Sequence, residues 1–456
     1  MELLVRNRMR KIIFLLIFFC GTNVCAQMII QKDSQIESIV SEVNGDSMRS
    51  YINKLVSFGT RHTLSSTTEE KKGIGAAREW VIQKFKDFSS RSNGRFTAEL
   101  DRWKLPPDNK RIDVEADMGN PMGILKGSDP SDKRIFIISA HLDSRISNVQ
   151  NRTDDAPGAN DDGSGTAAVI ECARILSKHN FASTILFVAF SGEEQGLLGA
   201  ERLAQRAKDS SWNIEAVLNN DIMGSNQSNE TGIIDNTRVR VFSEGLPAFD
   251  LDKKSASIRQ LGMENDGISR QLARYVKETG ERYIANLEVV MIYRNDRFLR
   301  GGDHTAFVLK GYPAVRITEM NENYDHQHQD LRTENGIRYG DVSEFMDFEY
   351  LRKNTALNLA CLANLAKSPS KPVDVKIDVR NLTNYTLLNW KGPATGKVKG
   401  YFVLIRETHQ SHWQKKFYTT ATTMRLPYSK DNYFFAVQSV SADGNESIPE
   451  VPAIGR

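Results

Sequence analysis

Two adjacent glutamates follow an apolar stretch of the sequence, at the point where a buried strand is expected to end. Residues 183–190 read STILFVAF, a run typical of such a strand, and Glu193 and Glu194 come shortly after it. One carboxylate at a strand end can bind a divalent metal ion while its neighbour takes a proton from a water molecule. The pair therefore predicts metal-assisted hydrolysis.

Acidic and histidine side chains follow other apolar stretches in the same way. The candidates are His141, Asp143, Asp161, Asp162, Asp221, His326 and His328. An open α/β sheet binds ligands outside the carboxyl ends of its strands, so these side chains are expected to converge. Carboxylate and imidazole groups suit zinc or a similar divalent ion. Each residue alone could belong to a turn or a helix cap, but converging acids repel one another unless a cation neutralises them.

Alternating strands and helices are predicted to position these residues. Residues 34–90 place apolar side chains at helical spacing. From residue 134 onward, continuous apolar strands alternate with helices, and a long helix is predicted over residues 341–367. This pattern predicts an α/β fold with a mostly parallel sheet covered by helices on both faces, in a domain that spans residues 27–368.

The C-terminal part of the chain has a different pattern. Residues 368–372, SPSKP, read as a linker, and short alternating stretches separated by turn residues fill residues 372–456. This predicts a small all-β sandwich. Trp390 and Tyr433 stand where a fibronectin type III domain has its core tryptophan and its corner tyrosine, so the segment resembles that module.

The strand-end motifs, taken in order, resemble those of the M28 family of zinc peptidases, the group of the bacterial leucyl aminopeptidases. The motifs are HLDS at 141–144, PGANDDGSG at 157–165, SGEE at 191–194, NND at 219–221 and NENYDHQHQD at 321–330. The resemblance covers roughly residues 35–367. It implies the zinc exopeptidase fold, which is phosphorylase/hydrolase-like, and two zinc ions per chain.

The resemblance also implies a role for each of these residues. The metal ligands would be His141, Asp161, Glu194, Asp221 and His326, with Asp161 bridging the two ions. Glu193 would be the general base, and Asp143 would orient the imidazole of His141. His326 is preferred to its rival His328 because it stands four residues before Asp330, which is the usual spacing in the family.

Three further residues near these motifs invite comparison with the family. Asp303, in GGDHTAF, resembles an aspartate that shapes the site without holding metal, and His304 beside it is ambiguous. Asn160 stands where some family members have a third aspartate. That position is not a ligand position, so it carries no conclusion.

The resemblance implies a zinc-dependent exopeptidase, with peptides as substrates. An aminopeptidase is favoured, hydrolysing N-terminal residues through a water activated by two zinc ions, with Glu193 taking the proton. A carboxypeptidase of the same family stays open, with Arg300 and Arg316 as candidates to bind a terminal carboxylate. A glutaminyl-peptide cyclase keeps the Glu-Glu pair but works with a single zinc. An inactive receptor or adhesion protein is disfavoured, because no ligand is lost.

The first 26 residues have the layout of a secretory signal peptide. Basic residues precede an apolar run, and small residues follow near Ala26. An uncleaved anchor, or lipid attachment at Cys20 or Cys25, is the alternative. The protein is therefore expected to be exported to the periplasm or the extracellular space, with no membrane span after signal removal.

Charge and cysteine content narrow the function classes further. The net charge is +3, but residues 1–26 contain four basic residues and one acid, so the rest of the chain is close to neutral. No basic field argues for nucleic acid. Beyond the signal, Cys172 and Cys361 lie in predicted helices and are expected to be buried thiols rather than a disulfide. The oligomeric state cannot be read from these features.

Overall fold

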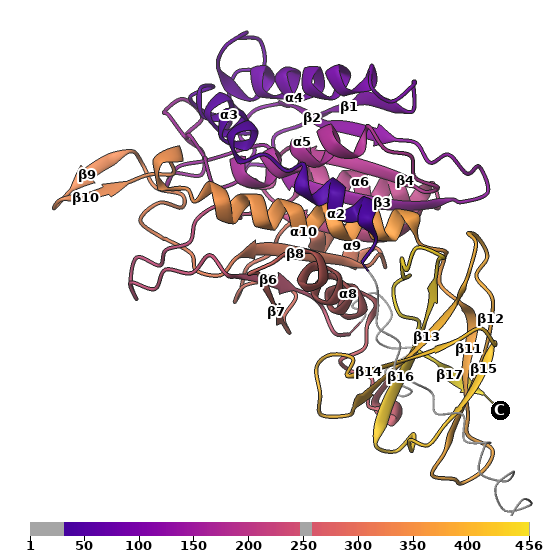
Figure 1. The fold of residues 1–456 in the computed structure, drawn as a ribbon. Coiled ribbons are helices and arrows are strands. Elements are labelled where there is room, and N and C mark those ends of the chain that lie inside the picture. The colour runs from indigo at the N-terminus through magenta and orange to yellow at the C-terminus, as the bar shows by residue number, and fades with distance from the viewer. Residues whose placement is uncertain (1–31, 247–257, 456) are drawn as a thin grey trace, which may run out of the picture.

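The computed structural model describes residues 32–246 and 258–455, and the predicted signal peptide at residues 1–26 lies outside them. An eight-stranded sheet runs through the larger part of the molecule (Figure 1), in the order β1-β2-β4-β3-β5-β8-β6-β7. The strands are β1 (Phe96–Leu105), β2 (Ala116–Leu125), β3 (Arg134–His141), β4 (Thr184–Phe190), β5 (Asn213–Asn220), β6 (Arg238–Phe242), β7 (Glu288–Ile292) and β8 (Ala314–Glu319). Strands β4, β3, β5 and β8 are parallel neighbours, whereas the antiparallel pairings involve β1, β2 and β6. The predicted mostly parallel α/β sheet is confirmed.

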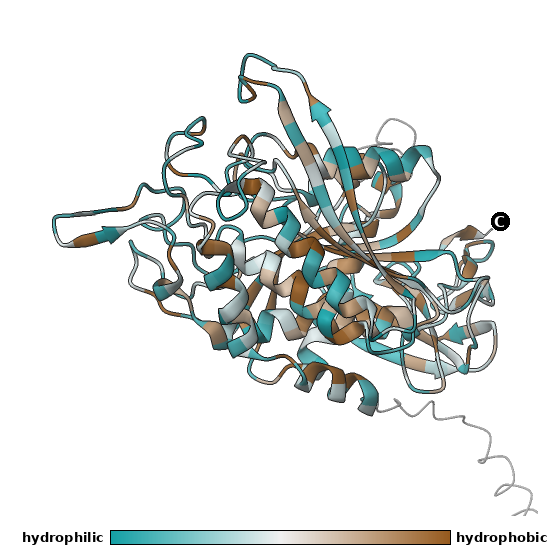
Figure 2. Ribbon diagram, turned by 90° about the horizontal axis from the view of Figure 1, so that it is seen from above, coloured by the Kyte–Doolittle hydropathy of each residue, from teal (hydrophilic) through white to brown (hydrophobic). Residues whose placement is uncertain are grey.

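Helices cover both faces of this sheet, as predicted. One face packs against α4 (Gly73–Ser89), α5 (Gly163–Leu176), α8 (Ile268–Tyr283) and α10 (Phe348–Lys367), with α2 (Ser34–Ser41) and α3 (Gly45–Val56) beyond them. The other face packs against α6 (Leu198–Asp209) and α9 (His304–Leu309). Successive side chains of a strand point to opposite faces, so Ile137 and Ile138 of β3 belong to two separate hydrophobic cores. Figure 2 shows hydrophobic residues concentrated on the central strands and on the helices against them.

The first turn of α5 packs against the end of β5. The carboxylate of Asp162 caps this helix by accepting a hydrogen bond from the main-chain nitrogen of Gly165 at 2.9 Å. A Cβ at Gly165 would lie 2.6 Å from the main-chain oxygen of Asn220, so glycine is required for this close approach. Asp161, the residue before the cap, is thereby fixed beside the end of β5.

The long C-terminal helix of this unit begins later than the sequence pattern predicts. Helix α10 starts at Phe348 because Asp347 caps it, accepting hydrogen bonds from the main-chain nitrogens of Glu349 and Tyr350, both at 3.0 Å. The preceding segment forms a short 3₁₀ turn, η1 (Ser343–Phe345). A hairpin of β9 (Arg332–Glu334) and β10 (Ile337–Tyr339) projects before it (Figure 1).

Strands β1, β2 and β6 have no counterpart in the sequence-based prediction. β2 contains Gly119, Pro121 and Gly123, residue types that are depleted in strands. It forms nonetheless, because β1 pairs along its whole length and β4 pairs along its other edge. Long-range pairing here outweighs local composition.

Residues beyond α10 form two small, mainly antiparallel sheets. The strands are β11 (Val373–Asp378), β12 (Thr386–Lys391), β13 (Gly400–Glu407), β14 (Lys415–Thr419), β15 (Thr423–Leu426), β16 (Tyr433–Val440) and β17 (Ala453–Gly455). One sheet has the order β15-β12-β11-β17 and the other β14-β13-β16. Trp390 of the first sheet packs edge-on against Tyr401 of the second, with ring centroids 5.4 Å apart. The predicted β-sandwich is present, and its likeness to a fibronectin type III domain stays a prediction.

Buried ion pairs join this sandwich to the larger unit. Asp266, which precedes α8, accepts hydrogen bonds from Arg274 of α8 at 2.9 Å and from Arg406 of β13 at 2.5 Å. Arg282 of α8 donates two hydrogen bonds of 2.8 Å to Glu446 of the sandwich. The sandwich therefore docks on α8 through charges that are removed from water.

A separate contact links the sandwich to the loop after β7. The hydroxyl of Tyr293, at the start of that loop, donates a hydrogen bond of 3.1 Å to the main-chain oxygen of Ser411. Arg274 donates to the same oxygen at 2.7 Å. The loop at 293–301 thus begins at a point that the sandwich fixes.

Two simpler expectations can be compared with the structure. Cys172 and Cys361 are buried and unbridged, as predicted. Within residues 32–246 and 258–455, no helix combines the length and apolar content that crossing a membrane requires.

Candidate metal centre

Four neighbouring parallel strands bring the predicted site residues to one edge of the sheet. His141 is the last residue of β3, the two glutamates follow β4, and Asp221 follows β5 directly. His328 lies in the loop after β8, and Asp161 precedes α5. The sequence-based expectation that strand-end side chains converge is met at β3, β4, β5 and β8.

These side chains form two donor groups that share one carboxylate. The first group is His141, Asp161 and Asp221, and the second is Asp161, Glu194 and His328. Within each group the ligand atoms lie within 4.8 Å of one another. Asp161 Oδ1 is 3.1 Å from His141 Nε2, and Asp161 Oδ2 is 2.9 Å from His328 Nε2. The two oxygens of Asp161 therefore face different groups, as a bridging ligand requires.

The structure brings His328 into the cluster and leaves His326 outside it, so the preference for His326 needs correction. His328 Nε2 lies 2.9 Å from Glu194 Oε1. The backbone of His328 is left-handed, with φ of 56°, and this turns its ring toward the cluster. His326 instead stacks on Phe345, with ring centroids 3.7 Å apart. The four-residue spacing to Asp330 misleads because the segment is an irregular loop, in which sequence spacing does not fix side-chain direction.

Asp143 acts mainly on the turn that holds the glutamates. Its carboxylate accepts hydrogen bonds from the main-chain nitrogens of Gly192, Glu193 and Glu194, at 3.0, 3.2 and 3.2 Å. His141 Nδ1 donates to the main-chain oxygen of Asp143 at 3.0 Å, whereas the carboxylate is 3.8 Å away. The contact that orients the imidazole thus comes from the backbone of Asp143 and not from its carboxylate. Because that oxygen can only accept, the proton sits on Nδ1 and leaves Nε2 free for a metal.

Glu193 lines the cluster without a protein partner of its own. Among the described residues, its carboxylate makes no hydrogen bond or ion pair. Burial, together with the neighbouring carboxylates of Glu194 and Asp221, raises the pKa of Glu193 to about 8. Burial and the nearby Glu193 also raise the pKa of Asp303 well above its ordinary value, and both of its carboxyl oxygens are buried without a partner. These acids lack compensating protein charge.

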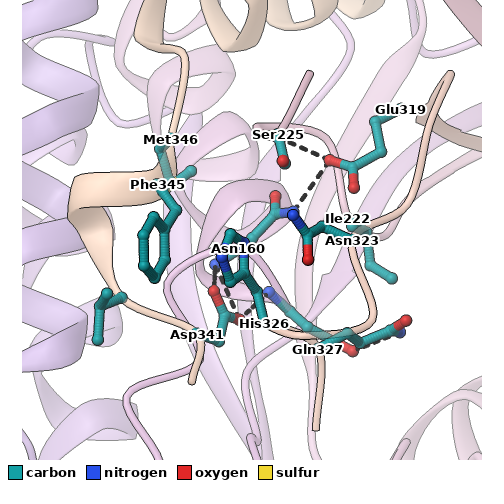
Figure 3. A pocket seen from close by; sticks show the side chains of 12 residues that line it. Asn160, Ile222, Ser225, Glu319, Asn323, His326, Gln327, Asp341, Phe345 and Met346 are labelled. Atoms are coloured by element: carbon teal, nitrogen blue, oxygen red, sulfur yellow. Dashed lines mark hydrogen bonds between the residues drawn. The ribbon is translucent and has the colours of Figure 1, made fainter. Parts of the chain in front are cut away.

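A polar network behind Asp161 was not foreseen from the sequence. The carboxylate of Asp341 accepts hydrogen bonds from the main-chain nitrogens of Asn160 and Asp161, at 2.8 and 2.7 Å (Figure 3). The side chain of Asn160 donates to Glu319 at 2.9 Å and accepts from the main-chain nitrogen of Gly224 at 2.8 Å. Asn160 therefore fixes the Asp161 loop, a role that its sequence position did not suggest.

His326 lines a small cavity in the same region (Figure 3). The cavity measures about 10 Å³, which is room for one water molecule. Burial lowers the pKa of His326 below its ordinary value, and its Nδ1 atom is buried without a partner. His326 contributes to the packing behind the site rather than to the donor groups.

Two arginine side chains beside the cluster, Arg111 and Arg145, were also missed. Arg145 Nε donates to Glu194 Oε2 at 2.8 Å, and Arg111 Nη1 donates to the main-chain oxygen of Glu194 at 2.6 Å. Arg316 is fully buried and pairs with Asp221 at 3.0 Å, so it is a structural charge and not a free carboxylate receptor. The position of Arg145, two residues after Asp143, was the only sequence signal for these contacts.

The donor set fits zinc. Each group combines carboxylate oxygens with an imidazole nitrogen, which is a ligand combination that zinc accepts. Both carboxyl oxygens of Asp303 are buried without a partner, and the partly buried Glu193 has no described partner for its carboxylate, so a divalent cation would neutralise this excess of acid. His304 is not part of the set, because its Nε2 atom bonds the main-chain oxygen of Asn295 at 2.7 Å.

Comparison with known sequences agrees with this chemistry. The family model described as peptidase family M28 matches residues 120–347. A probable zinc metalloprotease of Leptosphaeria maculans is 42% identical over 424 residues, covering 93% of this chain and 98% of that protein. A probable zinc metalloprotease of Pyrenophora tritici-repentis is 41% identical over 439 residues, covering 95% and 90%. These similarities reach into the C-terminal sandwich, because fewer residues are left uncovered than the sandwich contains.

Solved structures share the fold at much lower identity. The LapA aminopeptidase of Legionella pneumophila aligns with a TM-score of 0.52 at 18% identity, covering 74% of this chain and 76% of that one. A glutaminyl cyclase of Macrostomum lignano aligns with a TM-score of 0.51 at 14% identity, covering 74% and 94%. At these identities the likeness concerns the fold alone.

Proposed function

Because the chain belongs to peptidase family M28 and is a zinc metalloprotease, we propose that it is a two-zinc aminopeptidase that removes N-terminal residues from peptides. The preference for the amino terminus comes from the motif resemblance of the sequence. The proposal of two ions comes from the geometry of the site.

The observation that carries the proposal is the sharing of Asp161 between two donor groups. His141, Asp161 and Asp221 would hold one zinc ion, and Asp161, Glu194 and His328 would hold the other. A single-zinc site would need only one such group. Asp341 and Asn160 support the shared carboxylate by fixing its loop.

Bound zinc would supply Lewis acidity for the scissile carbonyl and for the attacking water. A carboxylate oxygen of Glu193 accepts the proton of that water and then delivers it to the leaving nitrogen. Glu193 is suited to both transfers because its carboxylate lines the cavity beside both donor groups and has no described partner that would occupy it. Asp143 keeps Glu193 in place by accepting the main-chain hydrogen bonds of its turn.

The test is hydrolysis of short peptides with free and with acetylated N-termini, before and after chelation and zinc restoration, with products identified by mass. Zinc-dependent loss of one residue from the free N-terminus only is the expected result. Cleavage from the other terminus would replace the proposal with a carboxypeptidase. Loss of ammonia from N-terminal glutamine without cleavage would replace it with a cyclase, and zinc binding without turnover would revive the receptor hypothesis.

We further propose that the protein is exported after cleavage near Ala26, on the strength of the sequence layout alone. N-terminal sequencing of the protein recovered from cells and from the medium tests this. A mature chain that still begins at Met1 would contradict it.

A further inference from the structure

A cavity of about 500 Å³ opens directly beside the two donor groups. Its wall contains His141, Asp161, Glu193, Glu194, Asp221 and His328 from the cluster. The same wall contains the four arginines Arg111, Arg145, Arg297 and Arg300. Four guanidinium groups in the wall of this cavity would favour a substrate that carries negative charge.

Two of these arginines are anchored on Glu194. Arg111 donates to its main-chain oxygen at 2.6 Å, and Arg145 donates to its carboxylate at 2.8 Å. Because Glu194 belongs to a donor group, both guanidinium groups lie beside the place where the scissile bond must sit.

Arg300 differs from its neighbour Arg297 in being unpartnered. Arg297 pairs with Asp296 at 3.3 Å and with Glu322 at 3.1 Å. The Arg300 side chain is exposed, and among the described residues it makes no hydrogen bond or ion pair. It lies in the loop at 293–301, next to Leu299, which is 91% exposed. Arg300 is therefore the guanidinium of the cavity that is free to bind a ligand.

The charge of the cavity depends on the metal ions. The acids in its described wall are Asp161, Glu193, Glu194 and Asp221, all of which belong to the cluster. Two divalent ions would balance these four carboxylates, and the arginines would then give the cavity a net positive charge. This step rests on the two-zinc function proposed above.

We propose that this cavity binds a carboxylate of the peptide substrate close to the scissile bond, with Arg300 as its main contact and with Arg111 and Arg145 adding positive charge. A guanidinium offers two parallel N–H groups to a carboxylate, which favours it over a neutral amide of the same shape. The carboxylate comes either from an acidic side chain near the cleaved bond or from the C-terminus of a short peptide.

Matched peptides distinguish these sources. Asp-Ala-Ala is compared with Asn-Ala-Ala, Ala-Asp-Ala with Ala-Asn-Ala, and Ala-Ala-Ala with its C-terminal amide. We expect the charged member of at least one pair to have a kcat/KM about 10-fold higher or more. The pair that shows the preference identifies the position of the bound carboxylate.

Variants of the loop test the role of Arg300. Arg300→Gln should lower kcat/KM more for the charged peptide than for its neutral partner and so remove the preference within that pair, and Arg300→Lys should restore part of it. Arg294→Gln is the matched control, because Arg294 lies in the same loop but not in the cavity wall. Equal loss on charged and neutral peptides in Arg300→Gln would overturn the proposal.

Binding gives a readout that does not depend on turnover. Calorimetry with the zinc-loaded Glu193→Gln variant should show tighter binding of the charged peptide, and adding Arg300→Gln should abolish the difference. If charged and neutral peptides bind equally, the carboxylate site is refuted even when neutral peptides are hydrolysed. If wild type hydrolyses no peptide but the binding difference appears, the site is supported and the aminopeptidase function is refuted.

Discussion

Carboxylates gather in two regions of the molecule, and the two regions differ in the protein groups that pair with them. At the interface with the C-terminal sandwich, each buried acid has arginine partners: Glu446 has Arg282, and Asp266 has both Arg274 and Arg406. At the strand ends, Arg145 pairs with Glu194 and Arg316 pairs with Asp221, but among the described residues Glu193 and Asp303 have no partner for their carboxylates. The two regions therefore differ in how completely protein charges compensate their acids.

Glu446 of the interface and Glu193 of the strand-end cluster have pKa values shifted in opposite directions. Burial alone would raise the pKa of Glu446, but Arg282 and Lys416 hold it below its ordinary value. Burial raises the pKa of Glu193 to about 8, and neighbouring acids add to the effect. Protein charges compensate the acids of the interface, whereas Glu193 and Asp303 in the strand-end cluster have no such partner among the described residues. Missing compensation is what marks the functional region.

The largest expected effect is the loss of turnover when Glu193 is changed to glutamine. Turnover should fall by about 10³- to 10⁴-fold, since the proton acceptor is lost. Zinc content should stay the same, and the free energy of unfolding should not fall, because the Glu193 carboxylate has no described partner to lose. Peptide assays, metal analysis and denaturant titration measure the three quantities. Loss of zinc in this variant would place Glu193 among the ligands.

A substitution at the interface with the sandwich should lower the free energy of unfolding. Asp266→Ala would leave Arg274 and Arg406 buried without their partner, at a cost of about 3–5 kcal/mol in the free energy of unfolding. Denaturant titration measures this cost. Glu115→Ala, at an exposed pair with Lys104, is the control and should leave the transition midpoint unchanged. An equally stable Asp266→Ala protein would contradict the idea that the interface is held by compensated charge.

The two histidines of the loop after β8 should differ in their effect on zinc affinity when each is replaced by alanine. His328→Ala should weaken zinc binding by about 100-fold or more, because a ligand is lost from the second donor group. His326→Ala should leave zinc affinity close to wild type, because its ring stacks on Phe345 outside that group. Competition with a chelator measures both affinities. The reverse result would restore the assignment of His326.

The smallest expected effect is on the pH dependence of the free energy of unfolding. The pKa of Glu446 is lowered in the folded protein, so its contribution to stability is present above the ordinary value of 4.5 and is lost as the pH falls below it. The difference in unfolding free energy between wild type and Glu446→Gln should therefore narrow as the pH falls from 7 toward 3. Paired denaturant titrations across this range measure it. A constant difference would show that protonation of Glu446 does not affect docking.

The sequence predicted the site correctly where candidate metal ligands follow neighbouring parallel strands. The parallel neighbours β3, β4, β5 and β8 were recognisable from their apolar runs, and a parallel sheet forces their carboxyl ends to one edge. His141, Asp161, Glu194 and Asp221 accordingly lie together in the donor groups.

Sequence-based prediction failed where the structure depends on the backbone conformation of a single residue or on contacts between segments far apart in the chain. Strand β2 forms against its glycines and proline because its neighbours pair with it. The choice of His328 depends on a left-handed residue in an irregular loop, which spacing does not encode. Asp341 acts on a loop 180 residues earlier in the chain, and the helix that the sequence predicts from residue 341 gave no hint of that contact.

The docking of the sandwich on α8 limits how this protein can be divided. The linker at 368–372 looks like a natural cut site, but truncation there would expose Arg274 and Arg282 without their acceptors on the sandwich and release Tyr293 from Ser411. Tyr293 opens the loop that carries Arg300 into the cavity wall. A protein shortened at this linker would thus lose contacts that position one wall of the cavity as well as its C-terminal sandwich, so the two units are expected to work as one structure.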